Sequence, residues 1–228
     1  MTISKFALIR SLRSPVALVF NCVLPIILIL IRPLWTGDVT PGYGFLVMII
    51  WGAAFLMAQS MQRDKAERTV VRILAAPVTM LNYMLQNMVA AIIPLLIQVA
   101  LISSLGVLIY DWSVTVSLGL ALCYTVFIIT SVAMGFAWIC LFKEKENSSN
   151  AFMFVISMGM FLSGVFMPVD MLPGILQYIG AIFPAYWAVL GIDHLLVEGM
   201  TTEYWLSILV MLLLGAVFLL YGGKRRII

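Results

Sequence analysis

The most concentrated chemistry in this sequence is a charged stretch, MQRDKAERTVVRILAAPVT, at residues 61–79. The chain is 64% hydrophobic and only 10% charged, yet the ionisable side chains of this stretch crowd into residues 63–72. Basic and acidic side chains are interleaved there, a pattern that suits docking onto a protein surface better than binding to anionic lipid. The charged residues are Arg63, Asp64, Lys65, Glu67, Arg68 and Arg72.

Residues 64–76 fit a short amphipathic helix. Asp64 and Arg68 form an i,i+4 pair of opposite charge. Pro77 ends the helix, because the residue before a proline is disfavoured in the α region. We therefore expect a charged ridge that faces water; the alternative is an ordinary solvated loop rich in basic residues. The apolar stripe on the opposite side consists of Ala66, Thr69, Val70, Ile73 and Leu74.

The sequence lacks the common catalytic and metal-binding motifs. Gly222-Gly223-Lys224 has neither the spacing nor the hydroxyl of a phosphate-binding loop, and a single histidine excludes a histidine-rich metal site. An intramembrane serine protease would pair Ser163 with His194. However, His194 is expected in an outer loop, and Ser163-Gly164 has the simpler role of letting helices approach closely. We predict no enzymatic activity, cofactor or metal site in this chain.

The composition predicts an all-α integral membrane protein, because a chain this apolar lies outside the range of soluble domains and only helices satisfy the backbone of such runs in lipid. A spanning helix needs about 20 apolar residues. We read residues 1–228 as one domain. The run beginning at residue 16 counts as a retained helix, because Arg32-Pro33 follows it where a signal peptide would have small residues. The six expected spans are residues 16–34, 42–61, 84–110, 114–142, 151–169 and 204–221.

The charges between these runs alternate in sign. With six spans, the basic residues at 5–13, 63–72, 143–145 and 224–226 fall on one side of the membrane. The positive-inside rule then places both termini in the cytoplasm. The connections on the opposite side carry Asp38, Asp111, Asp170, Asp193, Glu198 and Glu203, with Arg32 as their only basic residue.

An outer segment, residues 163–187, is apolar but interrupted by prolines. Backbone that is broken in this way has to be buried in protein or line a cavity if it enters the membrane. Two half-helices that dip back from the outer face, one of them at residues 173–182, meet that requirement. The alternative is an interfacial loop anchored by its aromatic side chains. The candidate residues are Ser163, Gly164, Pro168, Pro173 and Pro184.

None of the six spans contains an Asp, Glu, Lys or Arg, apart from Arg32, which follows the uncharged run 16–31 at the end of the first span. Ion-coupled transporters usually hold such groups within the membrane. We therefore prefer the interpretation that another chain supplies the energy for transport. An ion-coupled secondary transporter or channel is the alternative.

These features together resemble one family. Glu67-Arg68-Thr69, followed by Arg72-Ile73-Leu74-Ala75-Ala76-Pro77-Val78, resembles the cytoplasmic loop of ABC-2 type transporter permeases, with Thr69 where glycine is frequent. Ser163-Gly164-Val165-Phe166, followed by Pro168, Leu172-Pro173 and Pro184, resembles the signature around the fifth span of that family.

The resemblance implies the membrane half of an ATP-driven exporter in a bacterial cytoplasmic membrane. Arg63–Pro77 would be the coupling helix, and a separate ATPase subunit would bind Mg-ATP. A second permease chain, identical or related, would complete the transporter, with no nucleic acid as partner. The implied cargo is an antibiotic, peptide, lipid or glycan-linked molecule, and the implied role is antibiotic resistance. The 15 methionines favour hydrophobic or amphiphilic substrates, because thioethers adapt to varied shapes.

Overall fold

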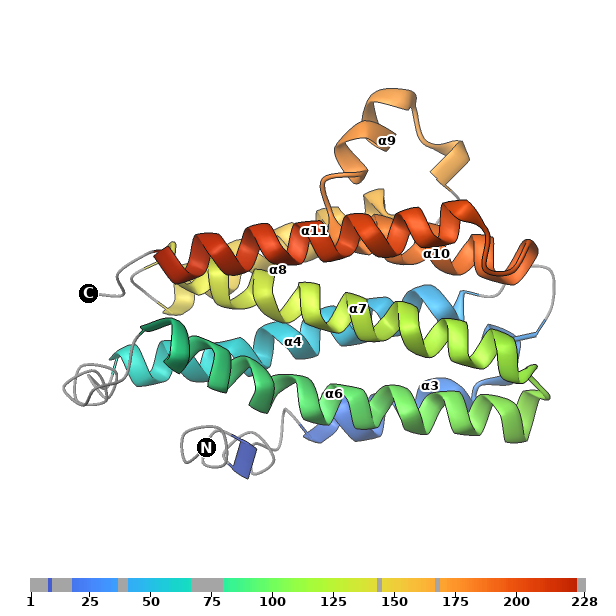
Figure 1. The fold of residues 1–228 in the computed structure, drawn as a ribbon, viewed down its shortest axis with the longest axis horizontal. Coiled ribbons are helices and arrows are strands. Elements are labelled where there is room, and N and C mark those ends of the chain that lie inside the picture. Colours follow the sequence, from blue (N-terminus) through green and yellow to red (C-terminus); the bar gives the residue numbers. More distant parts are fainter. Residues whose placement is uncertain are drawn as a thin grey trace.

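The computed structural model describes residues 8–9, 18–36, 41–66, 80–142, 145–166 and 169–224. Every regular element within these ranges is helical, as the all-α prediction requires. The long helices lie side by side along one axis (Figure 1). The elements are the π-helix η1 (Val19–Val23), α3 (Leu24–Leu30), the 3-10 turn η2 (Arg32–Leu34), α4 (Gly42–Ala66), α6 (Met80–Tyr110), α7 (Val114–Ile139), α8 (Lys145–Leu162), the 3-10 turn η3 (Val169–Met171), α9 (Gly174–Gly180), α10 (Pro184–Val197) and α11 (Thr202–Lys224).

Four described helices are long and apolar enough to cross a membrane. They contain the windows Gly42–Gln59, Asn82–Tyr110, Val114–Ile139 and Thr202–Gly222, which agree with four of the expected spans. The pair α9 and α10, bent by 104° at its break, passes the same test together and brings the number to at most five. The expected spans at 16–34 and 151–169 are not among these helices.

The first expected span, 16–34, ends earlier than expected, because α3 ends at Leu30. Within the described residues η1 and α3 cover Val19–Leu30. Residues 32–34 leave the α-helix and form η2. Pro33 has no N–H that could bond to the carbonyl of Ile29, four residues back, and a side-chain hydroxyl bonds to that carbonyl instead. The carbonyl of Leu28 accepts from the N–H of Ile31 at 3.3 Å and from an indole N–H as well. Trp35 Nε1 donates to the carbonyl of Leu28 at 2.8 Å, and the Tyr110 hydroxyl donates to that of Ile29 at 2.6 Å.

The π-helix η1 has a local cause. Pro25 lacks the N–H that would otherwise bond to the carbonyl of Asn21. The helical turn at this point contains one extra residue. As a result, the N–H of Leu24 donates to the carbonyl of Val19, five residues back. Asn21 is buried at the centre of this turn.

The fifth expected span is displaced towards the N-terminus of the chain. α8 begins at Lys145 and ends at Leu162, seven residues before the expected boundary at 169. Its apolar part, Ala151–Leu162, covers only about 18 Å at 1.5 Å per residue. The helix stops here because Gly164 has a positive φ of 85°, a conformation that glycine adopts without steric strain.

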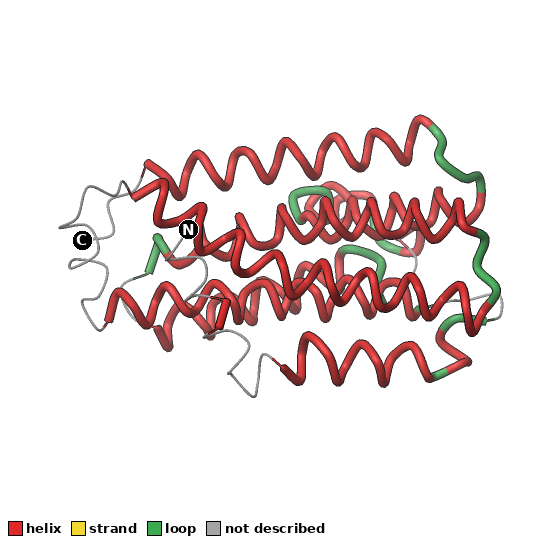
Figure 2. Tube along the Cα trace, turned by 60° about the horizontal axis from the view of Figure 1, so that its bottom comes forward, coloured by secondary structure: helices red, strands yellow, loops and turns green. Residues whose placement is uncertain are grey.

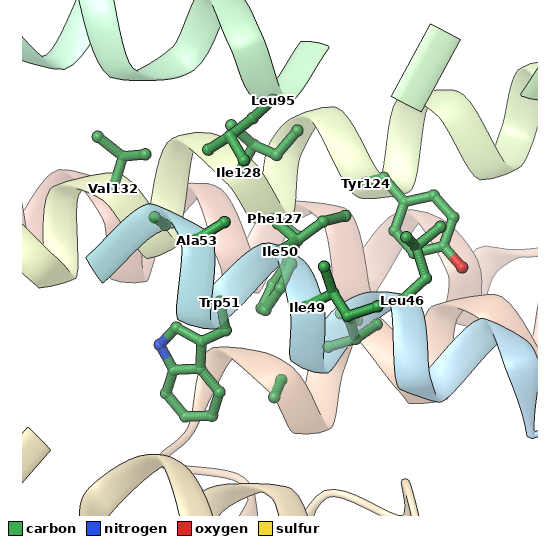
Figure 3. Packing of buried hydrophobic residues seen from close by; sticks show 14 of the residues in the cluster. Leu46, Ile49, Ile50, Trp51, Ala53, Leu95, Tyr124, Phe127, Ile128 and Val132 are labelled. Carbon is green, nitrogen blue, oxygen red and sulfur yellow. The ribbon is translucent and has the colours of Figure 1, made fainter. Parts of the chain in front are cut away.

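α7 is the central helix of the bundle and packs against α4, α6, α10 and α11. Its contact with α4 forms the core, in which Leu46, Ile50 and Trp51 lie against Tyr124 and Phe127 (Figure 3). Ser113 is the N-cap of α7, and its hydroxyl oxygen accepts a hydrogen bond from the N–H of Val116 at 3.2 Å.

The two ends of the bundle differ in charge. α4, α7 and α11 end at one end, where α6 and α8 begin (Figures 1 and 2). This end, called here the basic end, carries the chain positions Arg63, Lys65, Lys145 and Lys224. The opposite, acidic end carries Asp111 between α6 and α7, Glu198 after α10, and Glu203 at the start of α11.

Candidate functional site

A cavity of about 440 Å³ lies between α4 and α8. Methionine and phenylalanine dominate its walls, and none of the described residues that line it is ionisable. Met153 and Phe166, each 58% exposed, lie where it opens to the surface of the chain. The lining residues are Phe20 from η1; Met48, Gly52, Phe55, Leu56 and Gln59 from α4; Met153, Ile156, Ser157 and Met160 from α8; and Phe166.

Two polar side chains interrupt the apolar lining. Gln59 Nε2 donates to Ser149 Oγ at 3.1 Å, which joins α4 to α8 near the basic end. Ser157 Oγ donates to the carbonyl of Met153 in its own helix at 2.8 Å. The Gln59 amide is therefore the main group in the cavity that can recognise a polar atom of a ligand.

Aromatic side chains form a rigid wall behind the cavity. Phe55 stacks on Phe152 with ring centroids 3.7 Å apart, and Trp51 meets Phe152 edge to face. Trp51 is fully buried, and a Cβ added at Gly159 would come within 2.6 Å of its ring. Because these rings fill the space towards the core, the cavity is bounded on that side and accessible from the surface side.

Asp64 is placed differently from the sequence expectation. The charged ridge was expected to face water, but Asp64 is only 5% exposed, and Tyr83, 1% exposed, donates its hydroxyl to Asp64 Oδ2 at 2.6 Å. The expectation is wrong for this residue because α4 runs without a break to Ala66. Asp64 thereby continues the buried stripe of Met57 and Met61, and this spacing of four and three residues was readable in the sequence.

The rest of the predicted coupling helix is only partly within the described residues. Arg63 and Lys65 lie in the last turn of α4. Glu67, Arg68, Arg72 and Pro77 lie outside the described ranges, so the amphipathic helix at 64–76 stays a prediction.

The outer segment forms short helices with a break. Ser163 is buried and donates to the carbonyl of Gly159, so it caps the end of α8 rather than pairing with His194. Pro173 precedes α9 and Pro184 is the first residue of α10, so both prolines start helices, where the missing N–H has no cost. Pro168 lies outside the described residues.

α9 projects sideways from the bundle (Figure 1). Its side chains Ile175 and Tyr178 are 75% and 82% exposed, and Ile182 just after it is also exposed. The chain therefore does not bury this helix in its own outer mouth, as the re-entrant prediction assumed. The end of α9 does contact α8, because a Cβ at Gly180 would lie 2.6 Å from the carbonyl oxygen of Leu162.

Sequence reasoning missed the cavity as a site. Its residues recur every three or four positions in 48–59 and 153–160, but any apolar helix shows such spacing. Only the packing of α4 against α8 identifies which faces meet. Among the described residues no group of three or more His, Cys, Asp or Glu is placed to hold a metal ion.

The described part of the chain is thus a bundle of apolar helices, four of them long enough to cross a membrane, with an apolar cavity between α4 and α8. The family model described as ABC-2 family transporter protein matches residues 35–223, and the chain belongs to this family. It is thus a membrane component of an ABC transporter, and permeases of this family generally work with an ATPase subunit. No curated protein matches the sequence.

Proposed function

We propose that this chain is the transmembrane half of an ATP-driven exporter that moves hydrophobic or amphiphilic molecules out of the cytoplasm. The observation that carries the proposal is the apolar cavity between α4 and α8, with one amide among its described lining residues, in a member of the ABC-2 family. Its volume of about 440 Å³ falls within the range of roughly 300–1,000 Å³ typical of small-molecule sites.

The lining of the cavity supports an amphiphilic substrate. Methionine side chains, such as Met48 and Met160, adapt to ligands of different shape. Gln59 can bond to one polar group of a substrate whose remaining surface is apolar. Antibiotics, peptides, lipids and glycan-linked molecules include compounds of this kind, and export of a drug among them would confer resistance.

The energy source is proposed to be a separate ATPase subunit that binds Mg-ATP. This chain has no phosphate-binding loop of its own. The docking surface on it would be the charged stretch Arg63–Pro77, which connects α4 and α6 at the basic end.

The remaining architecture is part of the same proposal. With α3 and α8 counted as spans beside α4, α6, α7 and α11, the chain crosses the bacterial cytoplasmic membrane six times with both termini inside. The positive charge of the basic end supports this orientation. A second permease chain, identical or related, would complete the transporter, and either that chain or lipid would cover the exposed apolar side of α9.

The experiment reverses charge on the docking stretch. Cells would express the chain together with an ATPase encoded beside it, and co-purification and efflux of rhodamine 6G, an amphiphilic dye, would be measured. Arg68→Glu with Arg72→Glu should leave insertion intact, because other basic residues still set the topology. It should reduce both co-purification and efflux, because wrong-sign charges at an interface cost several kcal/mol. The same changes at Arg225 and Arg226, near the C-terminus, serve as the control. Wild-type binding and efflux in the Arg68, Arg72 variant would contradict the proposal.

An ion-coupled transporter is the second candidate, and buried Asp64 is the observation that favours it. The two candidates respond differently to energy sources. Collapsing the proton gradient at constant ATP would stop ion-coupled efflux, whereas it would leave ATP-driven efflux at its starting rate.

A further inference from the structure

The side chains of Asp64 and Tyr83 join two helices at the point where the chain connects them. Asp64 lies in the last turn of α4 and Tyr83 in the first turn of α6. Their hydrogen bond of 2.6 Å is buried and joins the two helices that residues 67–79 connect in the sequence. Neither residue lines the cavity.

Asp64 is an ionisable residue buried inside a membrane bundle, and such a residue is a functional candidate by default. Because burial removes its carboxylate from water, the carboxylate depends on hydrogen bonds within the protein, and the bond from the Tyr83 hydroxyl is one of them. What this bond requires of residue 64 is an acceptor oxygen, which an amide also supplies.

The partner residue is held in place as well. Asn87 Nδ2 donates to the carbonyl of Tyr83 at 2.9 Å within the first turns of α6, and both Asn87 and Tyr83 are buried. On the other side of the bond, Gln59 of the cavity lies five residues before Asp64 on the same continuous helix. Because Asp64 and Gln59 belong to one continuous helix, a movement of the Asp64 end of α4 also moves the wall of the cavity.

We propose that the Asp64–Tyr83 hydrogen bond is a clasp that makes the basic ends of α4 and α6 move as one body. This inference rests on the proposed function, in which an ATPase pushes on residues between these helices. With the clasp closed, the push moves α4 and therefore the cavity. With the clasp open, the ends of α4 and α6 can separate. A force applied between them then moves the helix ends apart and does not displace Gln59. Asp64 and Tyr83 are positioning residues in this scheme.

The test uses three single substitutions. Tyr83→Phe removes the donor and opens the clasp. Asp64→Asn keeps an oxygen that accepts from Tyr83 and is the conservative rescue. Tyr110→Phe is the matched control, because Tyr110 makes a hydrogen bond of the same length, 2.6 Å, from the other end of α6 to α3. Each variant is made in the full chain.

The first readout requires no ATPase. Spin labels replace Leu56 on α4 and Leu85 on α6, in a background without the three native cysteines, and electron–electron resonance measures their distance distribution in nanodiscs. Tyr83→Phe should broaden this distribution, whereas Asp64→Asn and Tyr110→Phe should match the parent. An unchanged distribution in Tyr83→Phe would overturn the clasp.

The second readout is coupling in the complex with the co-purified ATPase, in chains without labels. In Tyr83→Phe, rhodamine 6G transported per ATP hydrolysed should fall by about fivefold or more, a typical magnitude for the loss of coupling between sites. Co-purification of the ATPase should stay at the wild-type level. Equal uncoupling by Tyr110→Phe would indicate general loosening and overturn the proposal. If no ATPase binds even the wild-type chain, the proposed function fails, and the distance measurement alone decides the clasp.

Discussion

Gln59 on α4 donates a hydrogen bond of 3.1 Å to Ser149 on α8, although 90 residues separate them in the sequence. This bond joins the two helices that enclose the cavity and orients the only amide in its described lining. Gln59 therefore has two roles that substitution can separate: it links two helices, and it offers a hydrogen bond to a substrate.

Replacing Gln59 with leucine should change substrate preference more than stability. The lost interhelical bond is worth only about 0.6 kcal/mol, whereas a site that has lost its hydrogen-bonding group discriminates less well between polar and apolar ligands. Efflux of rhodamine 6G, which carries N–H groups, should fall relative to that of tetraphenylphosphonium, which has none. Gln86→Leu is the control, because Gln86 is an amide on α6 outside the cavity. An unchanged ratio of the two efflux rates in Gln59→Leu would contradict the prediction.

Filling the cavity at Gly52 should block transport without harming the fold. A Cβ at Gly52 would make only ordinary contact, 3.5 Å from the ring of Phe20, so a larger side chain can extend into the cavity. Gly52→Leu should lower the efflux of large amphiphiles at wild-type expression. Ala100→Leu adds similar bulk on the exposed face of α6 and should leave efflux unchanged. Normal efflux in Gly52→Leu would exclude this cavity from the substrate path.

Thr130 should stabilise the contact of α7 with α11. Its hydroxyl lies 2.8 Å from the carbonyl oxygen of Met211 and 3.0 Å from that of Val126. Thr130→Val keeps the shape and removes the interhelical bond, so the free energy of unfolding should fall by about 0.6 kcal/mol and at most ~1.7 kcal/mol. The measurement is unfolding by dodecyl sulfate in mixed micelles, with Thr125→Val on the same helix as the reference. Equal effects of the two substitutions would refute the role of the interhelical bond.

Gly106 should not tolerate even alanine. A Cβ there would lie 2.1 Å from the ring of Trp112, and Trp112 is held by Trp35 and Tyr43, whose ring centroids are each 5.4 Å from its own. Gly106→Ala should lower the free energy of unfolding by about 1–3 kcal/mol, as overpacking usually does. Gly174→Ala, at a position with open space, should have little effect. Retention of wild-type stability by Gly106→Ala would show that the ring of Trp112 can move to make room for the added methyl group, and would contradict the prediction.

The orientation can be tested with reporters. Both termini should be cytoplasmic, and the connection between α10 and α11 at residues 198–201 should be outside. A phosphatase or fluorescent reporter after Ile228 and another inserted at 198–201 should therefore report opposite compartments. Agreement between the two reporters would rule out the arrangement with both termini inside.

The sequence predicted the helices best in the long uncharged runs, because only one backbone conformation is possible for them in lipid. Uncharged runs such as 84–110 and 114–142 can only be helical in lipid, and the structure agrees there. It differs at the ends of 16–34 and 151–169, because single residues decide them. Pro33 stops the first helix, and the positive φ of Gly164 stops α8 before residue 169.

The candidate site was less accessible from sequence than the fold. The predicted helix at 64–76 placed Asp64 on its charged side, opposite the apolar stripe, and therefore in water. In the structure Asp64 continues α4, and its position relative to Met57 and Met61 places it on the buried face, where it accepts from Tyr83. The cavity depends on which faces of α4 and α8 meet, and no spacing within either helix carries that information.

The π-turn at Val19–Val23 has a consequence for how the cavity is inherited. Such a turn amounts to one residue inserted into an α-helix, and each residue of a helix advances by about 100°. The insertion therefore changes the direction in which the side chains of the turn itself point, and Phe20, within the turn, faces Gly52 and lines the cavity. Loss of one codon within this turn would leave the composition of the helix nearly unchanged and turn Phe20 away. Related genes that differ by a single-residue deletion here would thus encode the same fold with a different cavity.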